Sequence, residues 1–224
     1  METNSVKSTY TLLKLITIFF SRTDGRDKLA KFLQNFCRYK KYYSREKKTK
    51  LHWKNVQASL SEFRSILKFG KPFKNIVEVN ETMSSTTLDF IGYLKIFSLF
   101  SDIGYKLGDN IEYLAHYQFL SYNEKKCEIW SKTFQWYAYF CDVITGLFDI
   151  MRLKREDFKT QKQYAMKRWR MMIYWTGDLS DFFRVTPSFL KMYGLMAKHD
   201  GFSGIMGVWV GLTGCYKVWN NITK

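Results

Sequence analysis

Hydrophobic and polar positions along this chain repeat with the spacing of α-helices rather than β-strands. No run of alternating β-branched residues persists, and the chain contains only two prolines, Pro72 and Pro187. In several segments apolar side chains recur at intervals of three and four residues, which aligns them along one face of a helix. The pattern therefore predicts an all-α protein.

The first strongly amphipathic segment spans Arg26 to Tyr43 and follows a capping stretch, Ser21 to Asp24. Its apolar stripe consists of Leu29, Phe32, Leu33 and Phe36, and its basic flanks carry Lys28, Lys31 and Arg38. A bulky apolar face with basic flanks is typical of a helix that lies in a membrane interface. The alternative is a helix that packs on the core of a soluble bundle, and for any single helix this is the more common case.

A second amphipathic segment spans Ser59 to Ile76, and Ser59 with Glu62 fits a capping box. Its apolar face carries Leu60, Phe63, Ile66 and Leu67, and its basic face carries Arg64, Lys68, Lys71 and Lys74. We expect Pro72 to end or kink the helix near Gly70. Residues 80–86 are polar and are expected to form a linker.

The middle of the chain is apolar but contains regularly spaced ionisable residues. Residues 87–117 predict two helical pieces broken near Ser101 to Gly104, and residues 132–151 predict a weak membrane helix. Ionisable groups within such segments normally face the interior of a bundle or a partner. An aromatic segment over residues 171–193 follows, and Thr186-Pro187 is expected to break it.

The last apolar segment, Gly201 to Tyr216, contains no charged residue. Five glycines spaced three or four residues apart lie on one helical face: Gly201, Gly204, Gly207, Gly211 and Gly214. Small residues at this spacing allow close helix packing in a bilayer, so we predict a transmembrane or oligomerisation helix. A tightly packed helix or glycine-rich loop in a soluble core is the alternative, because the segment is slightly short for a span.

The chain carries a net charge of +16, unevenly distributed. Residues 1–86 contain 18 Lys and Arg against 7 Asp and Glu, whereas residues 87–151 contain 5 against 8. Residues 152–170 are again strongly basic. Such basic blocks suit anionic lipid headgroups or nucleic acid. The aromatic and basic stretch over residues 38–54 fits either partner.

Enzymatic chemistry finds little support in the sequence. His52, His116 and His199 are isolated, and the four cysteines form no paired motif with metal-ligand spacing. The glycine-rich segment lacks the Lys and Ser or Thr of a phosphate-binding loop. We therefore predict no catalytic, metal-binding or cofactor-binding residue, no cofactor and no small-molecule substrate.

Several short motifs occur in the order found in the peroxin-11 family of peroxisomal membrane proteins, which the chain resembles over roughly residues 10–220. The matching residues are Thr23 to Leu29 with Gln34, Phe36 and Arg38; Leu60, Arg64, Leu67, Gly70 and Lys71; Gly104-Tyr105, Leu107 and Asp109-Asn110; and Asp178, Asp200-Gly201, Gly204, Gly207 and Trp219. The departures are the aromatic and basic insert near residues 39–54 and the charged middle.

The resemblance implies one domain over residues 1–224, with basic amphipathic helices in 10–78, apolar helices in 87–151 and C-terminal helices in 171–219. It implies a non-enzymatic, membrane-associated helical protein that shapes the peroxisomal membrane through amphipathic helices. The expected lipid contacts are Lys28, Leu29, Lys31, Phe32, Leu33, Phe36, Arg38, Phe63, Arg64, Ile66, Leu67 and Lys68. The expected partners are anionic phospholipids and either further copies of the chain or subunits of a larger complex.

Two alternatives remain open from the sequence. One is a structural accessory subunit with this fold in a large organellar membrane complex, for example a respiratory complex of the mitochondrial inner membrane. The other is a basic helical protein that binds nucleic acid. It explains the charge but neither the spaced glycines nor the acidic middle, so we expect no nucleic-acid partner.

Overall fold

The computed structural model describes residues 2–85, 89–195 and 200–223, and within these ranges the chain is all-α, as predicted. It forms eight α-helices and one short 3-10 helix, η1 (Arg155–Asp157). The helices are α1 (Glu2–Ser21), α2 (Thr23–Tyr43), α3 (Lys47–Lys68), α4 (Lys71–Ser85), α5 (Phe90–His116), α6 (Glu124–Met151), α7 (Gln161–Met192) and α8 (Asp200–Ile222).

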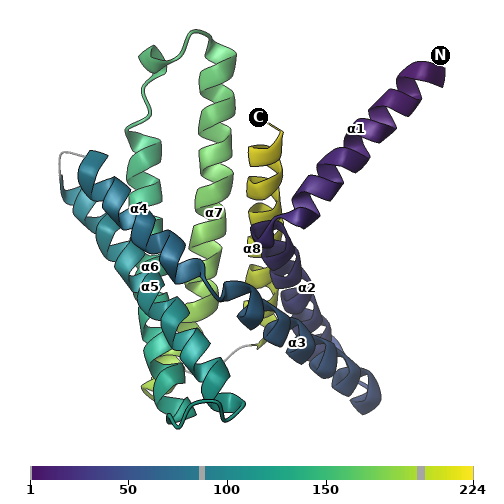
Figure 1. The fold of residues 1–224 in the computed structure, drawn as a ribbon, viewed down its shortest axis with the longest axis vertical. Helices are drawn as coiled ribbons and strands as arrows, with labels where there is room; N and C mark the ends of the chain where they lie inside the picture. The colour runs from purple at the N-terminus through teal and green to yellow at the C-terminus, as the bar shows by residue number, and fades with distance from the viewer. Residues whose placement is uncertain (1, 86–88, 196–199, 224) are drawn as a thin grey trace.

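The helices pack in a spatial order that differs from their order in the chain. The closest neighbours are α5 with α6 and α2 with α8, and further contacts join α8 to α7 and α7 to α6. Helix α3 contacts both α2 and α5, so it closes the arrangement, while α4 lies on α5. Figure 1 shows α3 and α4 running obliquely across the other helices and α1 projecting away from them. The last helix of the chain therefore packs beside the second.

Some helix boundaries differ from those that the sequence predicts. Helix α3 begins at Lys47, well before the Ser59 capping box, and α4 continues to Ser85, so most of the predicted linker is helical and residue 86 lies outside the described residues. The predicted end near Gly70 is confirmed, because Gly70 has a φ of 82° between α3 and α4. This left-handed conformation favours glycine.

Neither predicted break in the later helices occurs. Helix α5 passes continuously through Gly104, where a Cβ atom would lie 2.8 Å from the ring of Phe134 on α6. Gly104 therefore serves close packing rather than a turn. Helix α7 passes through Pro187, and the preceding Thr186 hydroxyl donates to the Phe182 carbonyl at 2.8 Å and accepts from Trp136 at 3.1 Å. The two contacts tie the residue before Pro187 to its own helix and to α6.

The glycine face of α8 packs directly on α2. Each glycine meets a different residue of that helix: Gly201 meets Tyr42, Gly204 meets Tyr39, Gly207 meets Asn35, Gly211 meets Phe32 and Gly214 meets Lys28. At Gly204 a Cβ would lie 2.9 Å from the backbone nitrogen of Tyr39, closer than real Cβ contacts allow. The partner of the glycine face is thus another helix of the same chain.

The prediction of a C-terminal transmembrane helix is not supported. Across residues 2–85, 89–195 and 200–223, no helix combines the length and the apolar character that a bilayer crossing requires, and α8 is included in that finding.

The interior of the bundle is polar and its exterior is rich in large apolar side chains. Among the residues that the structure describes, the largest fully buried side chains are Asn35, Ser101 and Ser203, whereas Phe73 is 73% and Phe90 68% exposed. In most soluble domains Phe is among the most buried residues and Asn is exposed. Close contacts between small residues, together with buried polar contacts, therefore replace a large apolar core.

We expect Gly211→Leu to destabilise the protein by about 2 kcal/mol or more, because its side chain would overlap the backbone of Phe32 in a tightly packed interface. Thermal unfolding of the purified chain measures the effect. Leu212→Ala is the matched control, since Leu212 lies on the exposed face of the same helix. Equal melting temperatures for Gly211→Leu and the unmodified chain would contradict the packing role of Gly211.

Candidate functional site

Large apolar side chains are exposed along α3, the turn after it and α4. They are Phe63 and Ile66 from α3, Phe69 from the turn, and Phe73, Ile76 and Val77 from α4. We call these six residues the α3–α4 apolar surface. The tight turn at Gly70 joins the two helices and brings the two groups of side chains near each other in the chain. Exposed apolar patches of this kind mark interaction sites.

Two other helices expose similar stripes at helical spacing. On α5 the stripe consists of Phe90, Tyr93, Phe97, Phe100 and Leu107, and on α8 it consists of Phe202, Ile205, Trp209, Leu212 and Tyr216. In α8 this stripe lies opposite the glycines that pack on α2. The bundle therefore presents apolar side chains on several outward faces.

The residues that the sequence predicted as lipid contacts fall into two groups. Leu33, Phe63 and Ile66 are exposed, and Lys28, Leu29, Phe32, Phe36, Arg38, Arg64 and Leu67 are half-buried. Lys31 and Lys68 are buried inside the bundle. Both lysines therefore lie away from the outer surface of the bundle, and the ion pairs described next show what they contact.

Asp27 of α2 is the centre of one buried ion network. Its carboxylate accepts from Arg64 of α3 at 3.0 Å and from Lys71 of α4 at 2.8 Å. Arg64 also donates to the side-chain oxygen of Gln34 at 2.6 Å. Burial alone would raise the pKa of Asp27, but Arg64 and Lys71 outweigh it and hold that pKa far below its ordinary value. This network fixes α3 and α4 against α2.

A second network joins α2 to α7. Lys31 donates to Asp181 at 2.5 Å, and Arg184 donates to the other oxygen of the same carboxylate at 2.7 Å. Burial would raise the pKa of Asp181, but Lys31 and Arg184 hold it at about 2, so the carboxylate is ionised. Two cations and one carboxylate in the interior are stable only while they stay paired.

Further polar contacts attach α3 and α4 to α5. Lys68 donates to Asp109 at 2.5 Å and to the hydroxyl of Tyr105 at 2.8 Å. On α4, the Asn75 amide donates to Asp102 at 2.7 Å, and Lys106 donates to the same carboxylate. The polar faces of α3 and α4 are thus satisfied by the bundle, which turns their apolar faces outward.

Two further carboxyl groups, Asp142 of α6 and Asp178 of α7, face the interior. Burial raises the pKa of Asp142 to about 7, against the effect of the Ser98 hydroxyl that donates to it at 2.5 Å. Burial raises the pKa of Asp178 to about 6, against the effect of Lys217. Sequence reasoning did not single out these residues as a site, although ionisable groups within apolar segments were the available signal.

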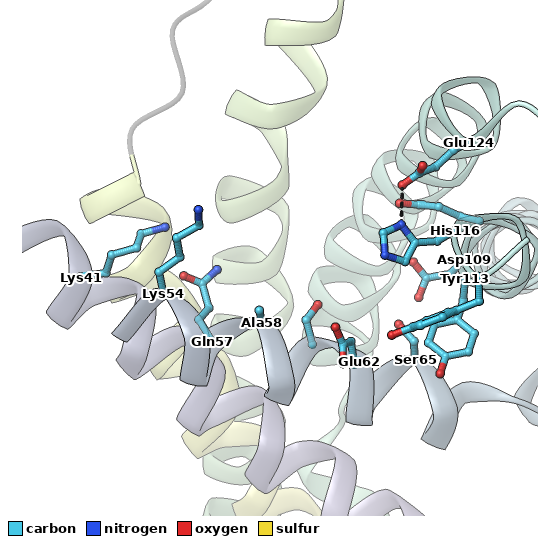
Figure 2. A pocket seen from close by; sticks show the side chains of 13 residues that line it. Lys41, Lys54, Gln57, Ala58, Glu62, Ser65, Asp109, Tyr113, His116 and Glu124 are labelled. Atoms are coloured by element: carbon cyan, nitrogen blue, oxygen red, sulfur yellow. Dashed lines mark hydrogen bonds and ion pairs between the residues drawn. The ribbon is translucent and has the colours of Figure 1, made fainter. Parts of the chain in front are cut away.

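A groove of about 470 Å³ lies between α3 and the adjoining ends of α5 and α6. Figure 2 shows Lys41 and Lys54 at one end of the groove and His116 with Glu124 at the other, where the two side chains lie 3.2 Å apart. In the part of the chain that the structure describes, no group of three His, Cys, Asp or Glu residues is placed to hold a metal ion. His199 lies outside the described residues.

One comparison with known proteins identifies a relationship. A family model described as peroxisomal biogenesis factor 11 (PEX11) matches residues 13–219, which is nearly the whole chain. No curated protein and no solved structure matches the chain.

We expect Asp142→Asn to stabilise the protein above neutral pH. The pKa of Asp142 is raised from 3.8 to about 7 in the folded state, so the folded state holds a proton that the unfolded state has already released. Stability is therefore lost as pH rises through this window. At about pH 8 the amide of the variant avoids that loss, so the free energy of unfolding should exceed that of the unmodified chain by on the order of 1 to 2 kcal/mol.

Thermal unfolding from about pH 5 to about pH 8 measures this effect. The matched control is Asp149→Asn on the same helix, at a half-exposed carboxylate paired with Lys95 at 2.9 Å. An Asp142→Asn variant that is no more stable than the unmodified chain at about pH 8 would contradict the raised pKa of Asp142.

Proposed function

We propose, from the premise that this chain belongs to the peroxisomal biogenesis factor 11 family, that it acts on the membrane through the outward faces of α3 and α4. Proteins of this family are non-enzymatic, localise to the peroxisomal membrane and function in peroxisome proliferation and biogenesis. The predicted localisation to the peroxisomal membrane is therefore confirmed, against the alternative of the mitochondrial inner membrane. What remains to be proposed is how the chain contacts that membrane.

The α3–α4 apolar surface is the observation that carries the proposal. Its side chains are exposed although they are large and apolar, and Phe73 is the most exposed of them. A helix with this distribution lies in the plane of a membrane interface, with its apolar face below the headgroups. Because α3 and α4 are held to the bundle by Asp27, Asp109 and Asp102, the surface is presented as one preformed unit.

Exposed basic residues elsewhere on the same two helices suit anionic phospholipids as the partner. Lys47, Lys48, Lys50 and Lys54 are exposed on the first part of α3, and the side chain of Lys74 on α4 is 66% exposed. Each cation near an anionic membrane contributes about 1 kcal/mol to the free energy of membrane binding, and salt weakens this contribution. Insertion of α3 and α4 into one leaflet would expand that leaflet alone, which would bend the membrane.

The apolar stripes on α5 and α8 support a second contact of the same protein. They lie on helices other than α3 and α4 and could meet further copies of the chain, as expected for a homo-oligomer. On this proposal the glycines of α8 position its apolar stripe by packing on α2, rather than by meeting another subunit themselves.

We expect the double variant Phe73→Glu with Ile76→Glu to lose binding to anionic vesicles by about tenfold or more, because two charges would replace inserted apolar groups. Flotation of the purified chain with vesicles measures binding, and electron microscopy of the same vesicles measures tubulation. The matched control is Phe119→Glu, an exposed apolar residue in the turn between α5 and α6.

The control should bind vesicles as the unmodified chain does. Equal binding by the double variant and the control would contradict a role of the α3–α4 apolar surface in membrane binding.

A further inference from the structure

The interior of the bundle contains a cavity of about 480 Å³ lined mainly by charged side chains. Eight cationic side chains and seven carboxyl groups line it, so positive charge is in excess before any carboxyl group takes up a proton. Several of the lining residues, including Asp24, Lys74 and Glu78, have side chains that are at least 42% exposed, which places an opening between the start of α2 and α4. The cavity is therefore accessible to solutes.

Most of the charges around this cavity are paired with one another. Three carboxylates, Asp27, Asp102 and Asp181, form ion pairs with five cations. Four of these cations line the cavity, and the fifth, Arg184, does not. These pairs hold the helices together and offer little unsatisfied charge to a ligand.

Lys28 and Lys217 differ from the other cations. Within the described residues, neither ammonium group has a carboxylate oxygen within the 4.0 Å of an ion pair. Lys28 comes from α2 and Lys217 from α8, and both also line a smaller recess of about 70 Å³ together with Asp178. Two ammonium groups without an ion-pair partner thus line the same space from the adjacent helices α2 and α8.

The positions of both lysines are set by specific packing. The stem of Lys28 lies over Gly214, where a Cβ would be 2.8 Å from its Cδ atom, so a larger residue would displace the lysine. The Lys217 ammonium lies 5.4 Å from the ring centre of Tyr174, and Asn220 donates to the Tyr174 hydroxyl at 2.8 Å. Gly214 therefore makes room for a cation rather than for a helix backbone.

Carboxyl groups beside the lysines complete the site. Asp178 faces Lys217 of α8, Lys28 and Lys31 of α2 and Asp181 of its own helix, and Asp142 of α6 also lies near it. It makes no hydrogen bond or ion pair within the described residues. In its protonated form it would donate a hydrogen bond to an anion instead of repelling it.

We propose that this cavity binds a phosphate group between the ammonium groups of Lys28 and Lys217, with the Asp178 carboxyl as an additional donor. Lysines are effective binders of phosphate as point charges, and the cavity is large enough for a phosphate monoester. The phosphate could be free in solution or could be the terminal phosphate of a lipid headgroup. The proposal does not depend on membrane binding by the α3–α4 apolar surface.

Calorimetric titration of the full-length chain in detergent with inorganic phosphate, and in parallel with sulfate, tests the site. Sulfate keeps its charge between about pH 6 and about pH 8, so its binding reports only the protein groups. We expect sulfate to bind more tightly at the lower pH, because Asp142 and Asp178 lose their negative charge there.

The double variant Lys28→Met with Lys217→Met should weaken binding at least about tenfold, since it keeps the side-chain stems but removes both charges. Lys162→Met, at an exposed lysine on α7, is the matched control and should bind as the unmodified chain does. Asp178→Asn should bind sulfate more tightly at about pH 8 and show a weaker pH dependence, an effect that general destabilisation would not produce.

Vesicles containing phosphatidic acid or phosphatidylglycerol distinguish the two sources of phosphate. Binding of free phosphate supports a soluble ligand, whereas a preference for phosphatidic acid that requires both lysines supports a lipid headgroup. The proposal would be overturned if neither free phosphate nor phosphatidic acid bound to the chain. It would also be overturned if binding were unchanged in the double lysine variant. The double variant Phe73→Glu with Ile76→Glu tests whether the two proposals are independent. If it loses vesicle binding but still binds phosphate in detergent, the phosphate site does not depend on the α3–α4 apolar surface.

Discussion

Buried ion pairs between helices far apart in the chain are the constraint on which the rest of the structure depends. Asp27 holds Arg64 and Lys71, and Asp181 holds Lys31 and Arg184. Each group would be costly to bury alone, so removing one partner leaves an uncompensated charge inside the bundle. These pairs therefore fix which face of α2, α3, α4 and α7 points inward.

The apolar exterior follows from this polar interior. An amphipathic helix whose charged face is satisfied inside the bundle must present its apolar face outward, and α3 and α4 do so along the α3–α4 apolar surface. In α8 the face toward α2 carries five glycines, which lets α2 approach closely, and its aromatic stripe is exposed on the opposite side. The arrangement is unfavourable in water and suits a protein that works at a membrane.

The cavity and the α3–α4 apolar surface are two consequences of the same arrangement. Helices that place charged side chains inside cannot fill the interior as tightly as interdigitating apolar groups do, and a space lined by Lys28, Lys217, Asp142 and Asp178 remains. The same inward placement of charge therefore leaves apolar side chains outside and a charged cavity inside.

The sequence by itself determined the all-α class, the apolar stripes, the end of α3 near Gly70 and the shared face of the five glycines, because helical periodicity and glycine conformation are local properties. Tertiary structure decided what each face contacts. Lys31 pairs with Asp181, 150 residues away, and the glycines meet α2 rather than lipid. Local periodicity identifies two faces of a helix but not which is buried, since that depends on the partners that the fold brings together.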